Sequence, residues 1–124
     1  MNQTRPKNLD LLTIRLPLPG VVSILHRISG ALLFVVGVPV MLMRLDRALH
    51  PDTLSWMDAP VSSGVMLVLQ WILTWAFCHH FCAGIRFLLL DIHRGVARAQ
   101  ARQSSGVVLG VGVLLTVLMG LWLW

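Results

Sequence analysis

The sequence is poor in charged residues. It contains no glutamate, and its charged residues make up only 12% of the 124 positions, whereas 56% are hydrophobic. A soluble domain carries roughly a quarter charged residues to cover its surface. This composition excludes an ordinary soluble protein and favours a chain that spans a membrane.

The sequence also has few cysteines, and its basic residues are scattered. Its two cysteines, Cys78 and Cys82, lie inside an apolar stretch, which argues against a secreted disulfide framework. The net charge is +5, but the Lys and Arg residues form no run or stripe of the kind that binds nucleic acid. We therefore attribute the positive charge to membrane topology, and we expect no nucleic-acid partner.

Three apolar segments occupy most of the chain. They are predicted at about residues 20–45, 64–90 and 107–124, and a bilayer-spanning helix needs about 20 apolar residues. Residues 1–19 are polar and basic and contain three prolines, so they form an N-terminal arm ahead of a transmembrane domain at 20–124. The predicted fold is all-α with three transmembrane helices, and no space remains for a soluble catalytic domain.

The distribution of basic residues predicts the orientation. The arm carries three Lys or Arg, the loop after the second span carries Arg94, Arg98 and Arg102, and the first loop has only two, together with Asp residues. Because basic loops stay inside, we expect the arm and the second loop to be cytoplasmic and the C-terminus to be periplasmic. Trp122 and Trp124 would then lie at the outer interface.

One polar group lies in the first predicted span. Ser23 and Arg27 are four residues apart and therefore share a helix face, and His26 precedes Arg27. An Arg near the centre of a membrane helix costs at least about 2.5 kcal/mol on insertion scales. A binding role for these residues is one explanation, and a snorkelling Arg27 that reaches the cytoplasmic headgroups is the other.

A second polar group, CHHFCAGIRFLLLD, covers residues 78–91. His79 and His80 are about 100° apart on a helix, so they cannot both face one site. The neighbours one turn from His80 are small (Ala76, Ala83 and Gly84), whereas those of His79 include Trp75. This difference favours His80 as the ligand of a flat macrocycle, and the ordinary alternative for either histidine is a hydrogen-bonded core residue.

Two other functions fit these groups less well. Zinc is disfavoured because four candidate ligands within five helical residues cannot converge on a tetrahedral centre. A transport path through Arg27, Arg86 and the two histidines is disfavoured because the charges gather in the cytoplasmic half and the third span has no ionisable residue. A purely structural membrane subunit without haem stays open, and haem content would distinguish it.

The segments RPKNLDLLTIRLPLPGVVSILHRISG (5–30) and HFCAGIRFLLLD (80–91) closely resemble the cytochrome b large membrane subunit of bacterial succinate dehydrogenase, respiratory complex II. The resemblance covers the three-span layout and includes the motifs S-x-x-H-R-x-[ST]-G and H-x-x-x-G-I-R. It implies that electrons pass from succinate through a flavoprotein subunit and an iron–sulfur subunit to ubiquinone, and that this chain is not catalytic alone. It also implies the bacterial cytoplasmic membrane as the location.

The resemblance also implies roles for individual residues. His80 matches the axial ligand of a haem b whose second ligand comes from a small membrane-anchor subunit, which would complete the helical bundle. Ser23 and Arg27 match positions that line the ubiquinone site. His26 and Arg27 match groups near the haem propionates, where Arg86 would add charge compensation.

Two points remain open in this resemblance. Some relatives have a second histidine at the position of Phe87, so a role of that site next to the haem is in doubt here. The residues also do not fix the direction of the reaction, so a quinol-oxidising fumarate reductase anchor is the alternative within the same family.

Overall fold

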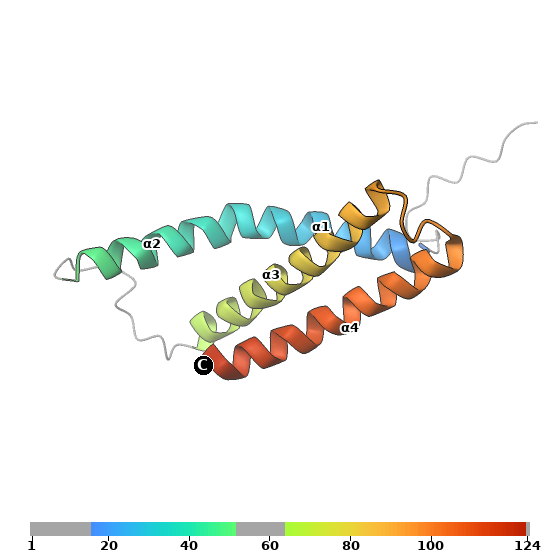
Figure 1. Cartoon of the computed structure of the whole chain (residues 1–124). Helices are drawn as coiled ribbons and strands as arrows, with labels where there is room; N and C mark the ends of the chain where they lie inside the picture. Colours follow the sequence, from blue (N-terminus) through green and yellow to red (C-terminus); the bar gives the residue numbers. More distant parts are fainter. Residues whose placement is uncertain (1–15, 52–63, 124) are drawn as a thin grey trace, which may run out of the picture.

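The computed structural model describes residues 16–51 and 64–123. All regular structure in these two ranges is helical, as Figure 1 shows. The elements in chain order are α1 (Leu18–Leu32), the π-helix η1 (Leu33–Gly37), α2 (Val38–Leu49), α3 (Gly64–Asp91) and α4 (Arg98–Leu123). The predicted all-α fold is confirmed.

The first three elements form one helical rod, Leu18–Leu49. Within it, the Val38 N–H donates to the carbonyl of Leu33, five residues earlier, which is the hydrogen bond of a π-turn. Pro39 follows directly, and a proline inside a helix lacks an N–H and collides with the carbonyl four residues before it. The wider turn lies where this collision would occur, so the helix passes Pro39 without ending.

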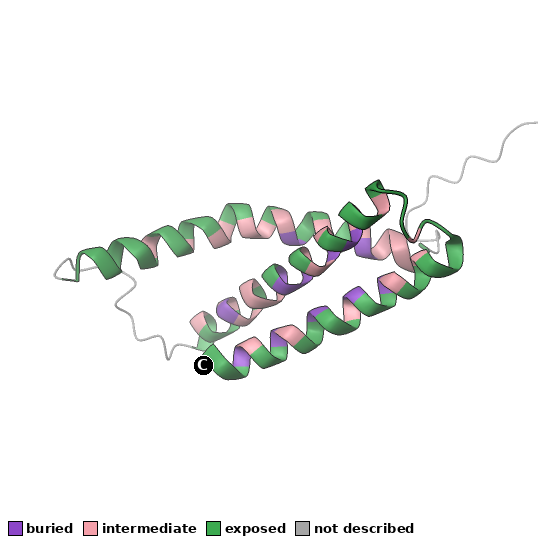
Figure 2. Ribbon diagram, in the orientation of Figure 1, coloured by how far each residue is buried: buried purple, intermediate pink, exposed green. Residues whose placement is uncertain are grey.

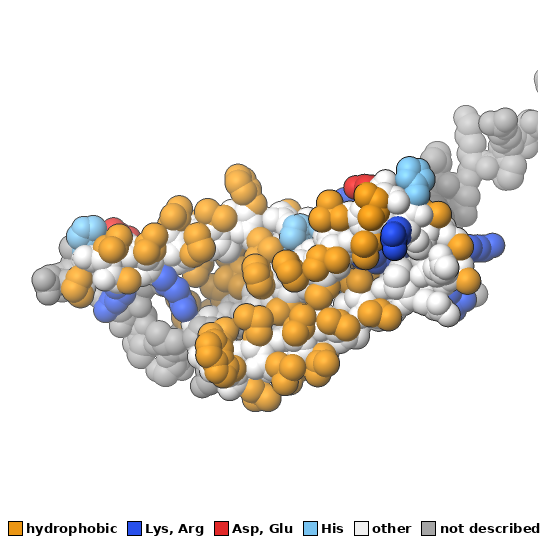
Figure 3. Space-filling view, viewed as in Figure 1, with side chains coloured by type: hydrophobic (Ala, Val, Ile, Leu, Met, Phe, Trp, Pro, Cys, Tyr) orange, Lys and Arg blue, Asp and Glu red, His pale blue; other side chains and the backbone are white. Residues whose placement is uncertain are grey.

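The helices have the length and composition of membrane spans. The rod, α3 and α4 contain 32, 28 and 26 residues, and each includes a strongly apolar stretch. Hydrophobic side chains cover the middle of the face seen in Figure 3, and charged side chains lie towards its two ends. The prediction of three transmembrane helices is confirmed.

The helix bounds differ from the predicted spans mainly at α4. This helix begins at Arg98, whereas its apolar segment begins at 107. Hydropathy marks only the part of a helix that lies in the membrane, so the polar first turns of α4 have the sequence character of a loop. The Ser105 hydroxyl donates to the Ala101 carbonyl over 2.7 Å within these turns.

The other bounds lie closer to the prediction. α3 ends one residue after the predicted span, and the first rod continues to Leu49 instead of ending near residue 45. Most of the arm at 1–19, the middle of the first loop and Trp124 lie outside the described residues.

The three spans pack unevenly. α3 contacts both α1 and α4, and α1 also contacts α4, whereas α2 diverges from the other helices (Figure 1). The buried positions of α4 form one stripe of mostly small residues along the helix: Ser105, Val108, Gly112, Thr116 and Gly120. Figure 2 shows buried residues on the inner sides of α3 and α4 and none on α2. Close packing is therefore concentrated around α3, and the flank of α2 is left open.

Candidate functional site

His26 and His80 meet where α1 crosses α3. Their rings stack face to face, with centroids 4.2 Å apart and planes 8° from parallel. The Phe87 ring lies 5.1 Å from that of His26. The structure thus brings together two histidines from separate sequence motifs, with Phe87 at the edge of the cluster.

The ring of His80 is held at one nitrogen. Its Nδ1 lies 3.1 Å from the carbonyl oxygen of His26 and 3.3 Å from the hydroxyl of Ser29, which itself donates to that carbonyl over 2.9 Å. A backbone carbonyl can only accept a hydrogen bond, so Nδ1 carries the proton and donates it.

This arrangement leaves the other ring nitrogen with its lone pair. His80 is half-buried, and its Nε2 has no hydrogen bond to any residue in the described ranges. Metal-binding histidines usually donate one N–H to a carbonyl or carboxylate and bind the metal through the other nitrogen. The site therefore presents an oriented imidazole in the tautomer that can bind a metal through Nε2.

Gly30 makes room for the His80 ring. A Cβ at this position would lie 2.7 Å from Cε1 of the ring, so any larger residue would require the ring or the helix to move. Gly84 lies beside His26, where a Cβ would meet Nε2 at 3.7 Å, an ordinary contact. The close approach of α1 and α3 at His80 therefore depends on Gly30.

The alanines near His80 serve packing. Ala76 and Ala83 are completely buried, and Ala83 belongs to a core cluster with Val22 and Val108. These small residues allow the neighbouring helices to approach α3. The chain itself therefore covers these two alanines, and the choice of His80 over His79 as the ligand remains a prediction.

His79 faces a different interface. Its side chain is 1% exposed, its ring stacks on Trp75 at 5.4 Å, and its backbone lies beside Gly112 of α4. Its Nε2 is buried and has no hydrogen-bond partner among the described residues. The two adjacent histidines thus point to different helices, as their angular separation predicts.

Ser23 and Arg27 both lie on α1, on the same face as Gly30. Ser23 is half-buried and Arg27 is exposed. Because Gly30 touches the His80 ring, the predicted quinone-binding face adjoins the histidine cluster. The roles predicted for Ser23 and Arg27 remain predictions.

Arg86 is buried between α3 and α4. Its Nε donates to the Ser104 hydroxyl over 2.9 Å and its terminal nitrogen donates to the Ala101 carbonyl over 3.2 Å. Its guanidinium also lies 5.3 Å from the centre of the Phe87 ring. The side chain therefore ties α3 to the first turns of α4, whereas His80 faces α1. The predicted position of Arg86 near haem propionates remains a prediction.

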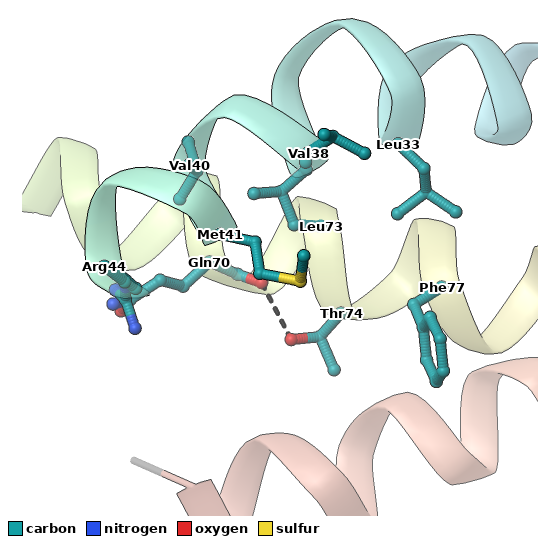
Figure 4. A pocket seen from close by; sticks show the side chains of 10 residues that line it. Leu33, Val38, Val40, Met41, Arg44, Gln70, Leu73, Thr74 and Phe77 are labelled. Carbon is teal, nitrogen blue, oxygen red and sulfur yellow. Dashed lines mark hydrogen bonds between the residues drawn. The ribbon is translucent and has the colours of Figure 1, made fainter. Parts of the chain in front are cut away.

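A groove of about 440 Å³ lies along the divergent α2; it begins about one turn from the histidine cluster and is lined by neither His26 nor His80. Its walls are mostly apolar, and they include Leu33, one turn beyond Gly30, and Phe77, one turn before His80 (Figure 4). Gln70 lies at the far part of the groove, with both amide atoms buried and without partners in the described part of the chain. The sequence does not single out Gln70, and Ser29 occupies the [ST] position of the first motif without a predicted role, so the surroundings of both side chains are seen only in the structure.

Comparison with known proteins shows to which family this chain belongs. The family model for the succinate dehydrogenase/fumarate reductase transmembrane subunit matches residues 1–119. The chain is 34% identical over 126 residues to the succinate dehydrogenase cytochrome b556 subunit of Coxiella burnetii, with 100% of both chains covered.

Two further relatives carry the same name. The subunit from Paracoccus denitrificans is 33% identical over 92% of this chain and 88% of its own length. The one from Rickettsia typhi is 30% identical over 93% of this chain and 90% of its own length. Together with its three apolar helices, these matches identify a multi-pass membrane protein that belongs to the succinate dehydrogenase/fumarate reductase transmembrane subunit family.

Proposed function

We propose that this chain is the cytochrome b membrane anchor of a succinate:quinone oxidoreductase, that it binds haem b through His80, and that it forms part of the ubiquinone-reduction site. One observation carries the haem assignment. The Nδ1–H of His80 is bound to the His26 carbonyl, which leaves Nε2 available to iron. The relatives are named as cytochrome b556 subunits, which supports the assignment.

The residues present fit a haem. The imidazole at His80 is oriented and half-exposed, Gly30 accommodates it, and the groove that begins about one turn away has mostly apolar walls, like the faces of a porphyrin. The His26 ring lies face to face with His80, so these two rings cannot bind opposite faces of one macrocycle. We therefore propose that a small membrane-anchor subunit would supply the second haem-binding residue.

The haem, when bound, would supply a one-electron centre within the membrane. Such a centre would serve electron transfer rather than oxygen binding. On this chain, His80 would hold the iron, and the His26 carbonyl accepts the hydrogen bond from Nδ1 that orients His80. His26, Arg27 and Arg86 are the candidates to compensate propionate charge.

The quinone site would use the neighbouring face of α1. The Ser23 hydroxyl would donate a hydrogen bond to a quinone carbonyl oxygen. Arg27 would stabilise the negative charge that develops on the quinone oxygen during reduction, which is a role suited to a fixed cation in a low-dielectric site. Arg27 is exposed on this chain, so it can face a ligand bound between this chain and the iron–sulfur subunit.

The exposed apolar surface of the chain indicates partners within the membrane. Large hydrophobic side chains are exposed along all three spans; Phe34, for example, is 76% exposed. Lipid and the small membrane-anchor subunit would cover these faces, and a flavoprotein subunit would complete the enzyme. We place the N-terminus in the cytoplasm and the C-terminus in the periplasm of a bacterial cytoplasmic membrane.

The experiment is to purify the complex in mild detergent through a tag on this chain and to record a reduced-minus-oxidised optical spectrum. A low-spin b-type signal together with flavin supports the proposal. Flavin without haem would overturn the role of His80 and leave a quinone-reducing anchor. Assays of succinate oxidation and fumarate reduction on the same sample would separate succinate dehydrogenase from its fumarate reductase alternative.

A further inference from the structure

We propose that Ser29 is a positioning residue for His80, and that its hydroxyl sets the orientation and the ligand strength of the imidazole. This inference rests on the proposed function, because it takes His80 as the haem ligand. Neither the motifs nor the comparisons assign a role to this serine.

The geometry defines what the hydroxyl does. Ser29 is 0% exposed, and its O–H donates to the His26 carbonyl over 2.9 Å. Because that proton is already used, the oxygen presents a lone pair to the Nδ1–H of His80, 3.3 Å away. The Nδ1–H is therefore shared by two acceptors on one turn of α1, the hydroxyl of Ser29 and the carbonyl of His26.

The second acceptor restricts this ring further. The side-chain torsion that rotates an imidazole about its Cβ–Cγ bond has broad minima and does not fix the ring plane by itself. The carbonyl alone allows the ring to tilt around one hydrogen bond. The hydroxyl adds a second contact beside the first, and Gly30 limits movement on the side of Cε1.

The Ser29 hydroxyl also affects the basicity of the His80 nitrogen that would bind iron. Acceptors at the N–H of a metal-bound histidine raise the basicity of the ligating nitrogen. A more basic ligand stabilises ferric iron relative to ferrous iron. Removal of the Ser29 hydroxyl should therefore shift the midpoint potential of the haem to a more positive value.

Ser105 offers a matched control. It is also 0% exposed, and its hydroxyl also donates to a carbonyl of its own helix, that of Ala101 in α4. Ser105→Ala thus removes the same atoms from an equally buried helical position, but none of its hydrogen bonds involves His80.

The test uses the assembled complex with Ser29→Ala or Ser105→Ala. Haem content, the midpoint potential by redox titration and the low-spin g-values by electron paramagnetic resonance are measured. We expect Ser29→Ala to retain haem, because the His26 carbonyl still accepts from Nδ1, but to shift the potential upwards and to change the g-values. Ser105→Ala should change neither. A Ser29→Ala complex that matches the unmodified one in both readouts overturns the proposal.

A second variant covers the case in which Ser29→Ala does not assemble. Ser29→Cys keeps the shape of the side chain but replaces the hydroxyl with a weakly hydrogen-bonding thiol, so the potential should shift in the same direction, and no shift overturns the proposal. Haem retained in full by His80→Phe would instead overturn the proposed function. Loss of haem in His80→Phe with an unshifted Ser29→Ala would overturn only the role of Ser29.

Discussion

The two adjacent histidines of α3 have different surroundings, because one faces α1 and the other faces α4. Towards α1, His80 is half-buried, bound at Nδ1 to a carbonyl and a hydroxyl, and without a partner at Nε2 among the described residues. Towards α4, His79 is enclosed beside Trp75 and Gly112, and the structure shows no acceptor or donor for its buried Nε2 in the described ranges. The facing helix therefore determines which imidazole can act as an oriented ligand.

The largest expected effect comes from replacing each histidine in turn, and it should appear as a difference in haem content. His80→Phe should abolish haem binding because phenylalanine has no ligating nitrogen. His79→Phe should retain haem, since an aromatic ring still stacks on Trp75 and an unpartnered buried nitrogen is removed. The pyridine haemochrome assay on purified complex measures this. Equal haem content in the two variants would contradict the assignment.

A glycine substitution on each side sharpens the same comparison. Gly30→Ala places a methyl group 2.7 Å from Cε1 of His80, whereas Gly112→Ala places one 3.6 Å from Cα of His79. We expect Gly30→Ala to lower haem occupancy or broaden the optical bands, and Gly112→Ala to preserve the spectrum. An unchanged spectrum for Gly30→Ala would mean that the His80 ring is not fixed by α1.

The exposed face of α1 can be tested separately from the haem. Arg27→Leu should lower quinone reduction by about 100-fold, the typical effect of removing one electrostatic stabiliser of a developing oxyanion. Succinate oxidation with a soluble dye should change little, because that reaction does not need the membrane site. Arg27→Lys keeps the charge and serves as the control, with a smaller loss expected. A normal quinone rate in Arg27→Leu would remove Arg27 from the site.

The smallest expected effect is a loss of thermostability when the polar contact between α3 and α4 is removed. Arg86→Met removes hydrogen bonds from a buried guanidinium to Ser104 and Ala101, and hydrogen bonds to charged groups contribute about 1.5–3 kcal/mol each. The complex should become less thermostable while keeping its haem. Arg94→Met, at an exposed position, is the matched control. Thermal inactivation curves measure the difference, and identical curves for the two variants would contradict the structural role of Arg86.

Much of the fold follows from the sequence because hydropathy alone marks membrane helices. The three spans, and the different directions of His79 and His80, depend only on apolar length and helical periodicity. The first turns of α4 could not be found in this way. They lie outside the apolar segment, and one of the contacts that hold them comes from Arg86, which belongs to another helix.

The sequence indicates a ligand for the site but not the groups that hold this ligand in place. Motif resemblance and neighbour size both indicate His80, and the structure adds that Ala76 and Ala83 are buried within the chain itself. Ser29 occupies the [ST] position of the first motif, but the motif does not say what its hydroxyl contacts, and that contact becomes visible only when α1 is placed against α3. Gln70, whose amide atoms have no partner among the described residues, is a similar case.

The most direct test of the central claim is chemical rescue of the ligand. In a His80→Gly complex, the low-spin haem signal should be lost, and added imidazole should restore it by filling the space of the missing ring. His79→Gly should retain the low-spin signal without imidazole. A His80→Gly complex with an unaltered low-spin spectrum before imidazole is added would show that iron is bound elsewhere and would contradict the account.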